Sequence, residues 1–430
     1  MLSEHLEHHA ESQRESPLES SSIGGDIDLA ISQSKSGQIQ LPPVQKGNLD
    51  FMPISKEKEA VLSRTRPSWL PPKDPSEEAK HLKEYQRMMA ASLEAEKKRT
   101  EKVKIQQNHE ETTQRSLNRI WQYYSEETTD LMEIDKRIFD LCWRGISSKL
   151  RSRVWQRAVG NELGLNAKSF EKALHRAKEI QTTEPRKRSE RERTMNRWFI
   201  DIDRDAETAF PELSLFQRNG PLWQDLVDVC KAYACYRGDV GYLYGLQLVA
   251  ALVLVQTPDT SEAFILLANC MNRPAPLAFH SGDFSATARI YNHAVETLAI
   301  KFPRVHEYLF GSIEDGGLGF TAELIFEPMF RTLFSNGLDI DKLCRVWDIW
   351  IFEGDKTLVH AAVAIVGCLQ TQLFGVAGDV DLKRRNIQEM LAWGPFNRTK
   401  PGQYWSMPHI SEEQFVEEIR LAGTLNYRGR

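Results

Sequence analysis

The spacing of hydrophobic positions changes at about residue 117. Residues 1–65 are rich in Ser, Gln, Glu and Gly, and their scattered apolar residues show no repeating spacing. We expect this stretch to be disordered, because it cannot bury enough apolar surface to offset the entropy of ordering it. From Leu117 to Gly375, apolar residues recur at spacings of three and four, the spacing of one helix face. Few stretches alternate strictly between apolar and polar residues, so the pattern predicts one all-α domain over residues 117–375.

A charged segment, residues 66–116, separates these two regions. Four prolines between positions 67 and 75 precede a polar run that predicts a helix from about residue 76 to about residue 107. Its apolar stripe is thin and consists of Leu82, Met89 and Leu93. Such a stripe favours a solvated charged helix, with a helix that binds a partner as the alternative.

Capping residues, glycines and prolines predict where the helices of the domain begin and end. The run Leu246–Gln256 is apolar on nearly all sides, which predicts a buried central helix. The pair Ser411-x-x-Gln414 is a capping box and predicts a helix in the C-terminal tail, residues 376–430. Further helices are expected at about residues 150–160, 167–182, 221–236, 260–272, 283–302, 322–335, 340–352 and 356–374.

Composition and charge argue against several classes of protein. The net charge is −5, so the chain lacks the excess of basic residues that is typical of nucleic-acid-binding proteins. No nucleic-acid partner is therefore expected. The longest apolar run, Leu246–Val255, is about half of the roughly 20 residues that a transmembrane helix needs. The six cysteines show no CxxC spacing, and the pair His293-x-x-Glu296 has no matching second pair. We therefore expect a cytoplasmic protein without a metal site, a cofactor or a transmembrane segment.

Three motifs follow one another in the first half of the domain. The first is Trp143-x-Gly145-Ile146-x-x-x-Leu150-Arg151-x-x-Val154-Trp155. The second is Ile202-x-x-Asp205-x-x-Thr208-Ala209-Phe210-Pro211, and the third is Asp239-Val240-Gly241-Tyr242-Leu243-Tyr244-Gly245. In this order and spacing they resemble the TBC domain, the catalytic domain of GTPase-activating proteins for Rab small GTPases.

The resemblance implies an all-helical fold, a GTP-bound Rab GTPase as partner and a position peripheral to endomembranes. Such a protein is not itself the hydrolase but acts in trans on the GTPase. TBC domains supply an arginine from the second motif and a glutamine from the third. The arginine stays charged and can donate two parallel hydrogen bonds to phosphate oxygens, which is worth on the order of 10³–10⁵ in rate. The glutamine can donate to and accept from the attacking water.

This sequence departs from the family at both catalytic positions. Thr208 stands at the arginine position and Tyr244 at the glutamine position. Threonine cannot carry a positive charge, whereas a tyrosine hydroxyl can donate to or accept from a water molecule. Arg204 is the candidate for a compensating arginine, because in a helical segment it would lie one turn from Thr208, roughly 6 Å along the axis. The alternative interpretation is a surface arginine beside Asp201 and Asp203.

The remaining motif residues have structural interpretations. Ile202 and Phe210 are expected in the core, and Asp205 is expected to hold the motif loop by side-chain hydrogen bonds. Gly241 and Gly245 allow a tight backbone before the central helix. Pro211 and Tyr242 complete the set of supporting residues.

Three functions stay open at this point. The first is a Rab GTPase activator, weakened because Thr208 and Tyr244 replace the catalytic pair. The second is a Rab-binding adaptor that does not accelerate hydrolysis. The third is a helical scaffold that gathers partners through the N-terminal region and the charged helix.

Overall fold

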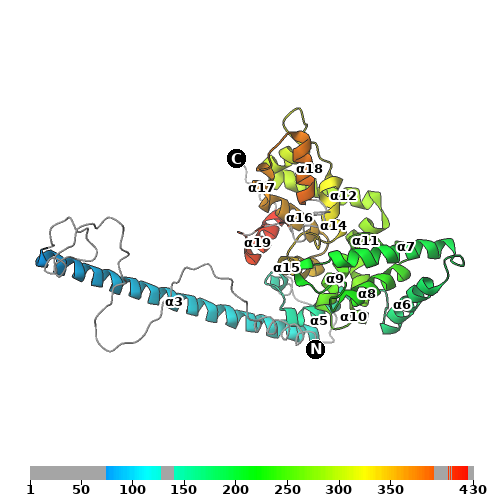
Figure 1. Cartoon of the computed structure of the whole chain (residues 1–430), viewed down its shortest axis with the longest axis horizontal. Coiled ribbons are helices and arrows are strands. Elements are labelled where there is room, and N and C mark those ends of the chain that lie inside the picture. The colour runs from blue at the N-terminus through cyan, green and yellow to red at the C-terminus, as the bar shows by residue number, and fades with distance from the viewer. Residues whose placement is uncertain (1–73, 127–139, 392–404, 406, 408, 425–430) are drawn as a thin grey trace, which may run out of the picture. The chain divides into compact units, whose positions relative to one another are not determined.

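The computed structural model of the chain describes residues 74–126, 140–391, 405, 407 and 409–424 (Figure 1). The described residues form helices and turns and contain no β-strand, so the all-α prediction is confirmed. The prediction of disorder for residues 1–65 lies outside the described residues. The chain divides into two units, and the boundary falls inside the first described helix, between Gln114 and Arg115.

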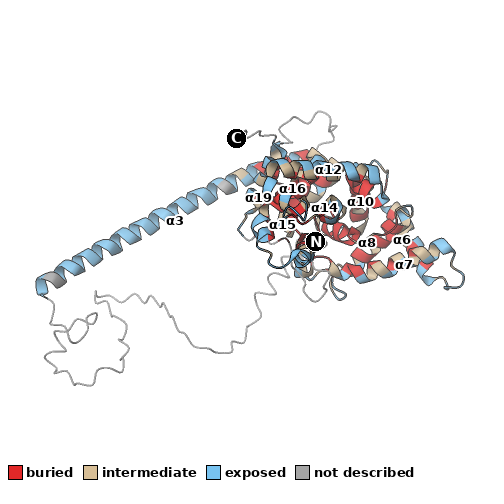
Figure 2. Cartoon of the chain, turned by 90° about the horizontal axis from the view of Figure 1, so that it is seen from above, coloured by how far each residue is buried: buried red, intermediate tan, exposed pale blue. Residues whose placement is uncertain are grey.

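That first helix is longer than the sequence pattern predicted. Helix α3 (Pro75–Glu126) has 52 residues and continues well beyond the expected end near residue 107. Residues 108–113 include weaker helix formers (Asn, His and two Thr), so the extension is better explained by Leu117, Trp121 and Tyr124, which lie at helical spacing and are buried at its end. Figure 2 shows it exposed along most of its length. Its last turns differ, because Leu117, Trp121 and Tyr124 are buried in the helical domain.

The buried end of α3 packs against two segments that are distant in sequence. The indole Nε1 of Trp121 donates to the carbonyl oxygen of Gly145 at 3.1 Å. The Trp121 ring lies 5.6 Å, between centroids, from the ring of Phe352. The last turns of α3 therefore belong to the core of the helical domain.

The centre of the domain is a helix buried on every side. Helix α9 (Leu246–Gln256) buries each residue from Leu246 to Leu254, which confirms the predicted central helix and its bounds. Three helices pack around it: α5 (Ser148–Val159), α8 (Trp223–Tyr236) and α10 (Thr260–Met271).

Two helices form a hairpin beside α8. Helices α6 (Ala167–Thr182) and α7 (Glu190–Asp205) both pack on α8 and are joined by a short loop (Figure 1). The bounds of α6 were predicted, whereas α7 was absent from the predicted helices. Its buried face consists of Met195, Phe199 and Ile202, at a helical spacing that the surrounding charged residues obscured.

The second half of the domain continues as a run of helices. These are α11 (Pro274–Ser281), α12 (Phe284–Lys301), α13 (Pro303–Phe310), α14 (Ala322–Arg331), α15 (Ile340–Glu353), α16 (Lys356–Cys368), α17 (Gln370–Phe374), α18 (Val380–Leu391) and α19 (Glu412–Gly423). The helix predicted at 356–374 is divided at Leu369 into α16 and α17. Helix α19 begins at the predicted capping box of Ser411 and Gln414 and packs on α15 and α16.

A sealed aspartate ties the first motif to α15. Asp348 has no exposed surface, and its carboxylate accepts from the indole Nε1 of Trp155 at 2.8 Å and from the backbone N–H of Ile146 at 3.1 Å. Arg151 donates to the same carboxylate from Nε at 3.1 Å and from a terminal nitrogen at 3.2 Å. We call Asp348, Arg151, Trp155 and Ile146 the Asp348 cluster. It holds together segments that are about 200 positions apart in the chain.

The six cysteines are all free thiols. Cys142, Cys230, Cys270 and Cys344 are buried, and Cys235 and Cys368 are half-buried. Burial raises the pKa of every one of these thiols, to about 11 even at half-buried Cys235. They are therefore protonated at neutral pH. Separately, none of the helices in the described ranges has the length and apolar character needed to cross a membrane.

Candidate functional site

The second motif lies where α7 ends. The helix stops at Asp205 and gives way to two 3₁₀ turns, η2 (Ala206–Thr208) and η3 (Pro211–Leu213). Thr208 is half-buried, and its hydroxyl donates to the carbonyl oxygen of Asp205 at 2.6 Å. The end of α7 therefore fixes the position of the Thr208 side chain at the edge of the domain.

The core residues of this motif hold the turn in place. Ile202 is 0% exposed and Phe210 is 2% exposed. Phe210 has a φ of 39°, in the left-handed region, and Pro211 then opens η3. Burial of the Phe210 ring stabilises a backbone conformation that is unfavourable for a residue with a side chain.

The third motif forms the loop between α8 and α9. Gly241 has a φ of +75°, and a Cβ atom there would lie 2.4 Å from the ring of Trp198. Gly245 has a φ of 109° and directly precedes α9. Between them Tyr242 is buried and Tyr244 is half-buried. The loop thus carries Tyr244 at its end, next to the fully buried helix.

Tyr242 connects the two motifs. Its hydroxyl oxygen lies 3.1 Å from Oδ2 of Asp205 and 2.9 Å from Oε1 of Gln247, within donating distance of both. Burial, and then the negative charge of Asp205, raise the pKa of the Tyr242 hydroxyl above its usual value. The hydroxyl therefore keeps its proton and acts as a donor.

Gln247 completes this connection and was missed in the sequence. It is 0% exposed, and its Oε1 also accepts from the backbone N–H of Gly245 at 2.8 Å. Its Nε2 donates to Oγ1 of Thr208 at 3.4 Å. The only signal was a polar residue inside an apolar helix, because buried amides nearly always have hydrogen-bond partners. We call Asp205, Thr208, Tyr242 and Gln247 the Asp205 cluster.

The structure brings the two catalytic-position segments together through this cluster. Thr208 is bonded to Gln247 of α9, and Asp205 is bonded to Tyr242 of the loop that carries Tyr244. Thr208 and Tyr244 are both half-buried, so neither is enclosed in the core. Hydrogen bonds therefore join the two motif segments, and the side chains of Thr208 and Tyr244 both stay partly exposed.

Arg204 lies in the last turn of α7, where two carboxylates bind it. Its Nε donates to Asp205 at 2.8 Å, and a terminal nitrogen lies 2.8 Å from Asp201. The hydrogen bond to Asp205 raises the pKa of Arg204 further. Of the two aspartates beside Arg204 in the sequence, Asp201 pairs with Arg204, and Asp203 pairs with Lys231 at 2.7 Å. The helix turns Asp203 toward α8 and Asp201 toward Arg204.

A second arginine beside the site was also missed. Arg218, in the loop after η3, places its Nε 3.0 Å from Oε1 of Glu207, the residue before Thr208. Its side chain is 69% exposed, against 48% for Arg204. No spacing in the sequence indicated Arg218, because the loop fold alone brings it to Glu207. Among the described residues, no group of three or more His, Cys, Asp or Glu side chains is placed to hold a metal ion.

Comparison with known proteins places this arrangement in a family. The Rab-GTPase-TBC domain family matches residues 148–374, and the middle domain of SBE2 matches residues 39–101. TBC1 domain family member 14 of Bos taurus is 31% identical over 357 residues, which cover 79% of this chain and 50% of that protein. A TBC domain-containing protein of Schizosaccharomyces pombe is 30% identical over 329 residues, which cover 76% of this chain and 68% of that protein. The chain spans about half the length of the first of these relatives.

A solved structure has a similar fold. The crystal structure of the Chlamydomonas flagellar RabGAP TBC domain aligns with a TM-score of 0.53 and 19% identity, covering 73% of this chain and 92% of that one. The family match covers more than half of the chain, and it contains the Asp205 cluster, Tyr244 and most of the Asp348 cluster. The chain therefore belongs to the Rab-GTPase-TBC domain family.

Proposed function

We propose that this chain binds a GTP-loaded Rab GTPase and stimulates its GTP hydrolysis only weakly. One observation carries the proposal: the arginine position holds Thr208, whose hydroxyl is bonded to Asp205 and Gln247 inside an otherwise ordered motif. The ordered second motif supports binding of the Rab GTPase. The absence of a guanidinium group at position 208 supports weak stimulation of GTP hydrolysis. The chain would act in the cytoplasm, at the endomembranes where its GTPase partner is found.

The size of the expected deficit follows from the chemistry. An arginine supplied in trans neutralises charge that builds on the transferred phosphate and is worth on the order of 10³–10⁵ in rate. Thr208 has no charge to offer. Tyr244 retains a hydroxyl that can orient a water molecule by donating or accepting one hydrogen bond. We therefore expect any acceleration through these two positions to be small.

Two arginines are candidates for residual stimulation. Arg204 would have to leave both Asp201 and Asp205 before it could reach a phosphate. Arg218 would have to leave only Glu207, and its side chain is the more exposed of the two. Because Arg218 has one carboxylate to leave and Arg204 has two, we favour Arg218 as the arginine that reaches the nucleotide.

The test measures binding and single-turnover hydrolysis on the same samples over a panel of Rab GTPases. We expect at least one GTPase to bind in its GTP-loaded form, with much weaker binding to its GDP-loaded form. Hydrolysis by that GTPase should accelerate far less than the 10³–10⁵ that an arginine supplies. Failure to bind any GTP-loaded Rab would overturn the proposal, and so would full stimulation.

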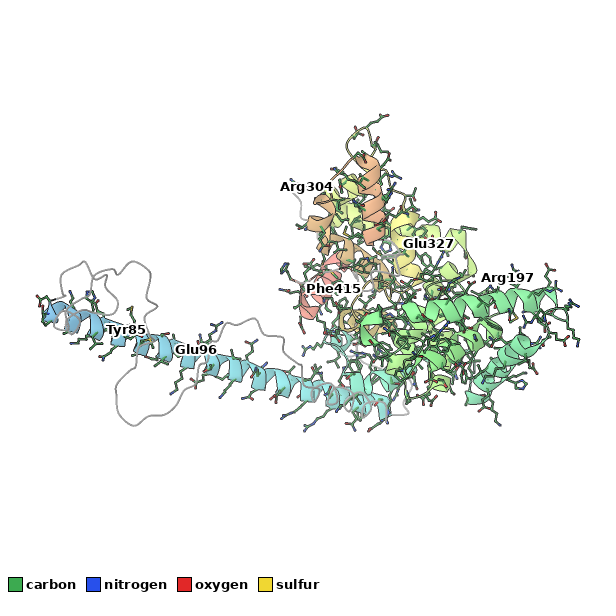
Figure 3. The ribbon with its side chains drawn as sticks, viewed as in Figure 1. Tyr85, Glu96, Arg197, Arg304, Glu327 and Phe415 are labelled. Atoms are coloured by element: carbon green, nitrogen blue, oxygen red, sulfur yellow. The ribbon has the colours of Figure 1, made fainter. Side chains whose placement is uncertain are left out.

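Variants then separate the two arginines. Arg218→Ala should abolish the residual acceleration without changing binding, whereas Arg204→Ala should leave the acceleration in place. Arg304→Ala is the matched control, because Arg304 is an exposed arginine on α13, far along the chain from the motifs (Figure 3). Residual acceleration that survives Arg218→Ala and disappears with Arg204→Ala would reverse the assignment.

A second candidate function is a Rab-binding adaptor with no stimulation at all. The substitutions at Thr208 and Tyr244 favour it directly. The same panel distinguishes it, because the adaptor binds the GTP-loaded form and leaves the hydrolysis rate unchanged. A scaffold that uses the exposed part of α3 would instead lose its partners when that helix is deleted, with GTPase binding intact.

A further inference from the structure

Basic residues gather at the tip of the α6–α7 hairpin. Residues 184–197 contain six cationic side chains and three carboxylates, whereas the whole chain has a net charge of −5. Figures 1 and 2 show the connecting loop projecting from the end of the helical domain. We call this region the basic tip; its cations are Arg186, Lys187, Arg188, Arg191, Arg193 and Arg197.

The three carboxylates of this stretch, Glu184, Glu190 and Glu192, balance half of its six positive charges and leave a net charge of +3. Glu184 pairs with Lys187 at 3.1 Å, and Glu192 pairs with Arg176 of α6 at 2.7 Å. Arg186, Arg193 and Arg197 are exposed and form no ion pair with another described residue.

Arg193 and Arg197 also share one face of α7. They lie four positions apart, which places their side chains next to each other on the helix surface. Figure 3 shows Arg197 projecting outward from α7. Its one hydrogen bond goes to the hydroxyl of Thr194, at 3.2 Å, which leaves its charge without a carboxylate. Unpaired arginines side by side favour a partner that carries many negative charges.

The chemistry of the tip selects the kind of partner. No large hydrophobic side chain is exposed within residues 184–197, and one exposed isoleucine, Ile200, follows on α7. The core of a protein–protein interface usually needs aromatic or apolar anchors, whereas lipid headgroups attract basic side chains without them. We propose that the basic tip binds the anionic headgroups of a phospholipid membrane. Each exposed arginine near such a surface strengthens binding roughly fivefold.

Membrane binding at the tip would also position the candidate site. Helix α7 has 16 residues and runs from the tip to Asp205. At 1.5 Å per residue, Asp205 lies about 22 Å along the helix from Glu190 and about 12 Å from Arg197, the basic residue of the tip that is nearest to it. This inference does not depend on the proposed GTPase activity, because vesicle binding is measured without a GTPase and none of the basic residues of the tip belongs to the Asp205 cluster.

The test is co-sedimentation of the full chain with vesicles. We expect binding to vesicles of phosphatidylcholine mixed with phosphatidylserine, no binding to phosphatidylcholine alone, and weaker binding as salt is raised. The triple variant Arg186→Ala, Arg193→Ala, Arg197→Ala should weaken binding on the order of 100-fold. Absence of binding to the anionic vesicles would overturn the proposal.

A matched control removes the same number of charges elsewhere. Arg153, Arg304 and Arg385 are exposed arginines that form no ion pair within the described parts of the chain, and their triple alanine variant should bind vesicles like the original. Equal loss in both variants would point to net charge alone and contradict the proposal. Retention on immobilised heparin without vesicle binding would indicate a soluble polyanion and would also contradict it. Thermal unfolding by circular dichroism checks that both variants are folded.

Discussion

Two buried aspartates organise the motif region, and their partners differ in exposure. Asp348 is completely buried, and so is most of Arg151, whose side chain is 11% exposed. Asp205 is almost as buried, at 3%, but its partner Arg204 is 48% exposed. One cluster is sealed inside the domain, and the other lies where the core meets the solvent.

The difference in exposure suggests that one cluster stabilises the fold and the other positions surface side chains. Removing one member of a buried ion pair leaves an uncompensated charge in the interior, which is strongly destabilising. At a half-open pair, water can replace the lost partner, so the cost is small. The Asp348 cluster is therefore suited to holding distant segments together, and the Asp205 cluster to positioning Thr208 and Tyr244 at the surface.

The largest effect is expected when the catalytic residues of the family are restored at the Asp205 cluster and the neighbouring loop. The double variant Thr208→Arg, Tyr244→Gln should accelerate hydrolysis by the bound Rab on the order of 10³–10⁵-fold, or about 4–7 kcal/mol. Single-turnover hydrolysis measures the gain. Thr208→Lys with Tyr244→Gln is the matched control, and should gain less because lysine cannot donate two parallel bonds. A folded, Rab-binding double variant without any gain would contradict the proposed geometry.

The second largest effect is expected when the Asp348 cluster loses its aspartate. Asp348→Ala should lower the free energy of unfolding by about 3–5 kcal/mol, because Arg151 would stay buried without its counter-charge. Urea denaturation followed by circular dichroism measures it. A loss below about 1 kcal/mol would mean that water enters this cluster as freely as it reaches Arg204.

Acid tests a titrating residue, His280, that belongs to neither cluster. Burial lowers the pKa of His280 from its ordinary 6.5 to about 4, and its Nε2 lies 3.1 Å from the carbonyl oxygen of Arg331. Between these values the unfolded chain binds a proton that the folded chain does not, so stability falls as pH falls. The free energy of unfolding should drop by about 2 kcal/mol through His280 between pH 7 and pH 5.

The variant His280→Gln isolates this contribution. Glutamine can still donate to the Arg331 carbonyl but does not titrate. The loss of stability between pH 7 and pH 5 should therefore be smaller in the variant by about 2 kcal/mol, measured by urea denaturation at both values. Equal pH dependence in the two proteins would show that the pKa of His280 is the same in the folded and unfolded states, which would contradict the effect of burial.

The smallest effect is expected when Arg204, the exposed partner of Asp205, is removed. Arg204→Ala should change the free energy of unfolding by no more than about 1 kcal/mol, since the pair with Asp205 is half exposed. Urea denaturation beside Asp348→Ala compares the two clusters on one scale. A loss as large as that of Asp348→Ala would remove the distinction between them.

Local patterns were sufficient to predict several elements. The bounds of α6 and α9 and the capping box of α19 could be predicted because each rests on neighbouring residues: a polar cap, an apolar run or a Ser–Gln pair. Helix α11 was missed because Pro274 indicated a break. It occupies the first helical position, where a missing N–H costs nothing.

The candidate site was predictable in its motif residues and not in its connections. Thr208 and Tyr244 could be located from the motif spacing, and their roles stay predictions. The bond from Gln247 to Thr208 joins residues 39 positions apart, and the pair of Arg218 and Glu207 depends on a loop conformation. No periodic pattern encodes contacts of these two kinds, because they arise from packing between segments.

The protonated, shielded state of the native thiols has a practical consequence. Maleimides react with exposed thiolates, so the four buried native cysteines should label slowly. Once half-buried Cys235 and Cys368 are replaced by serine, a cysteine introduced at position 208 or 244 should label selectively. A dye at either position would then report, by its change in fluorescence, whether a nucleotide-loaded partner covers that surface.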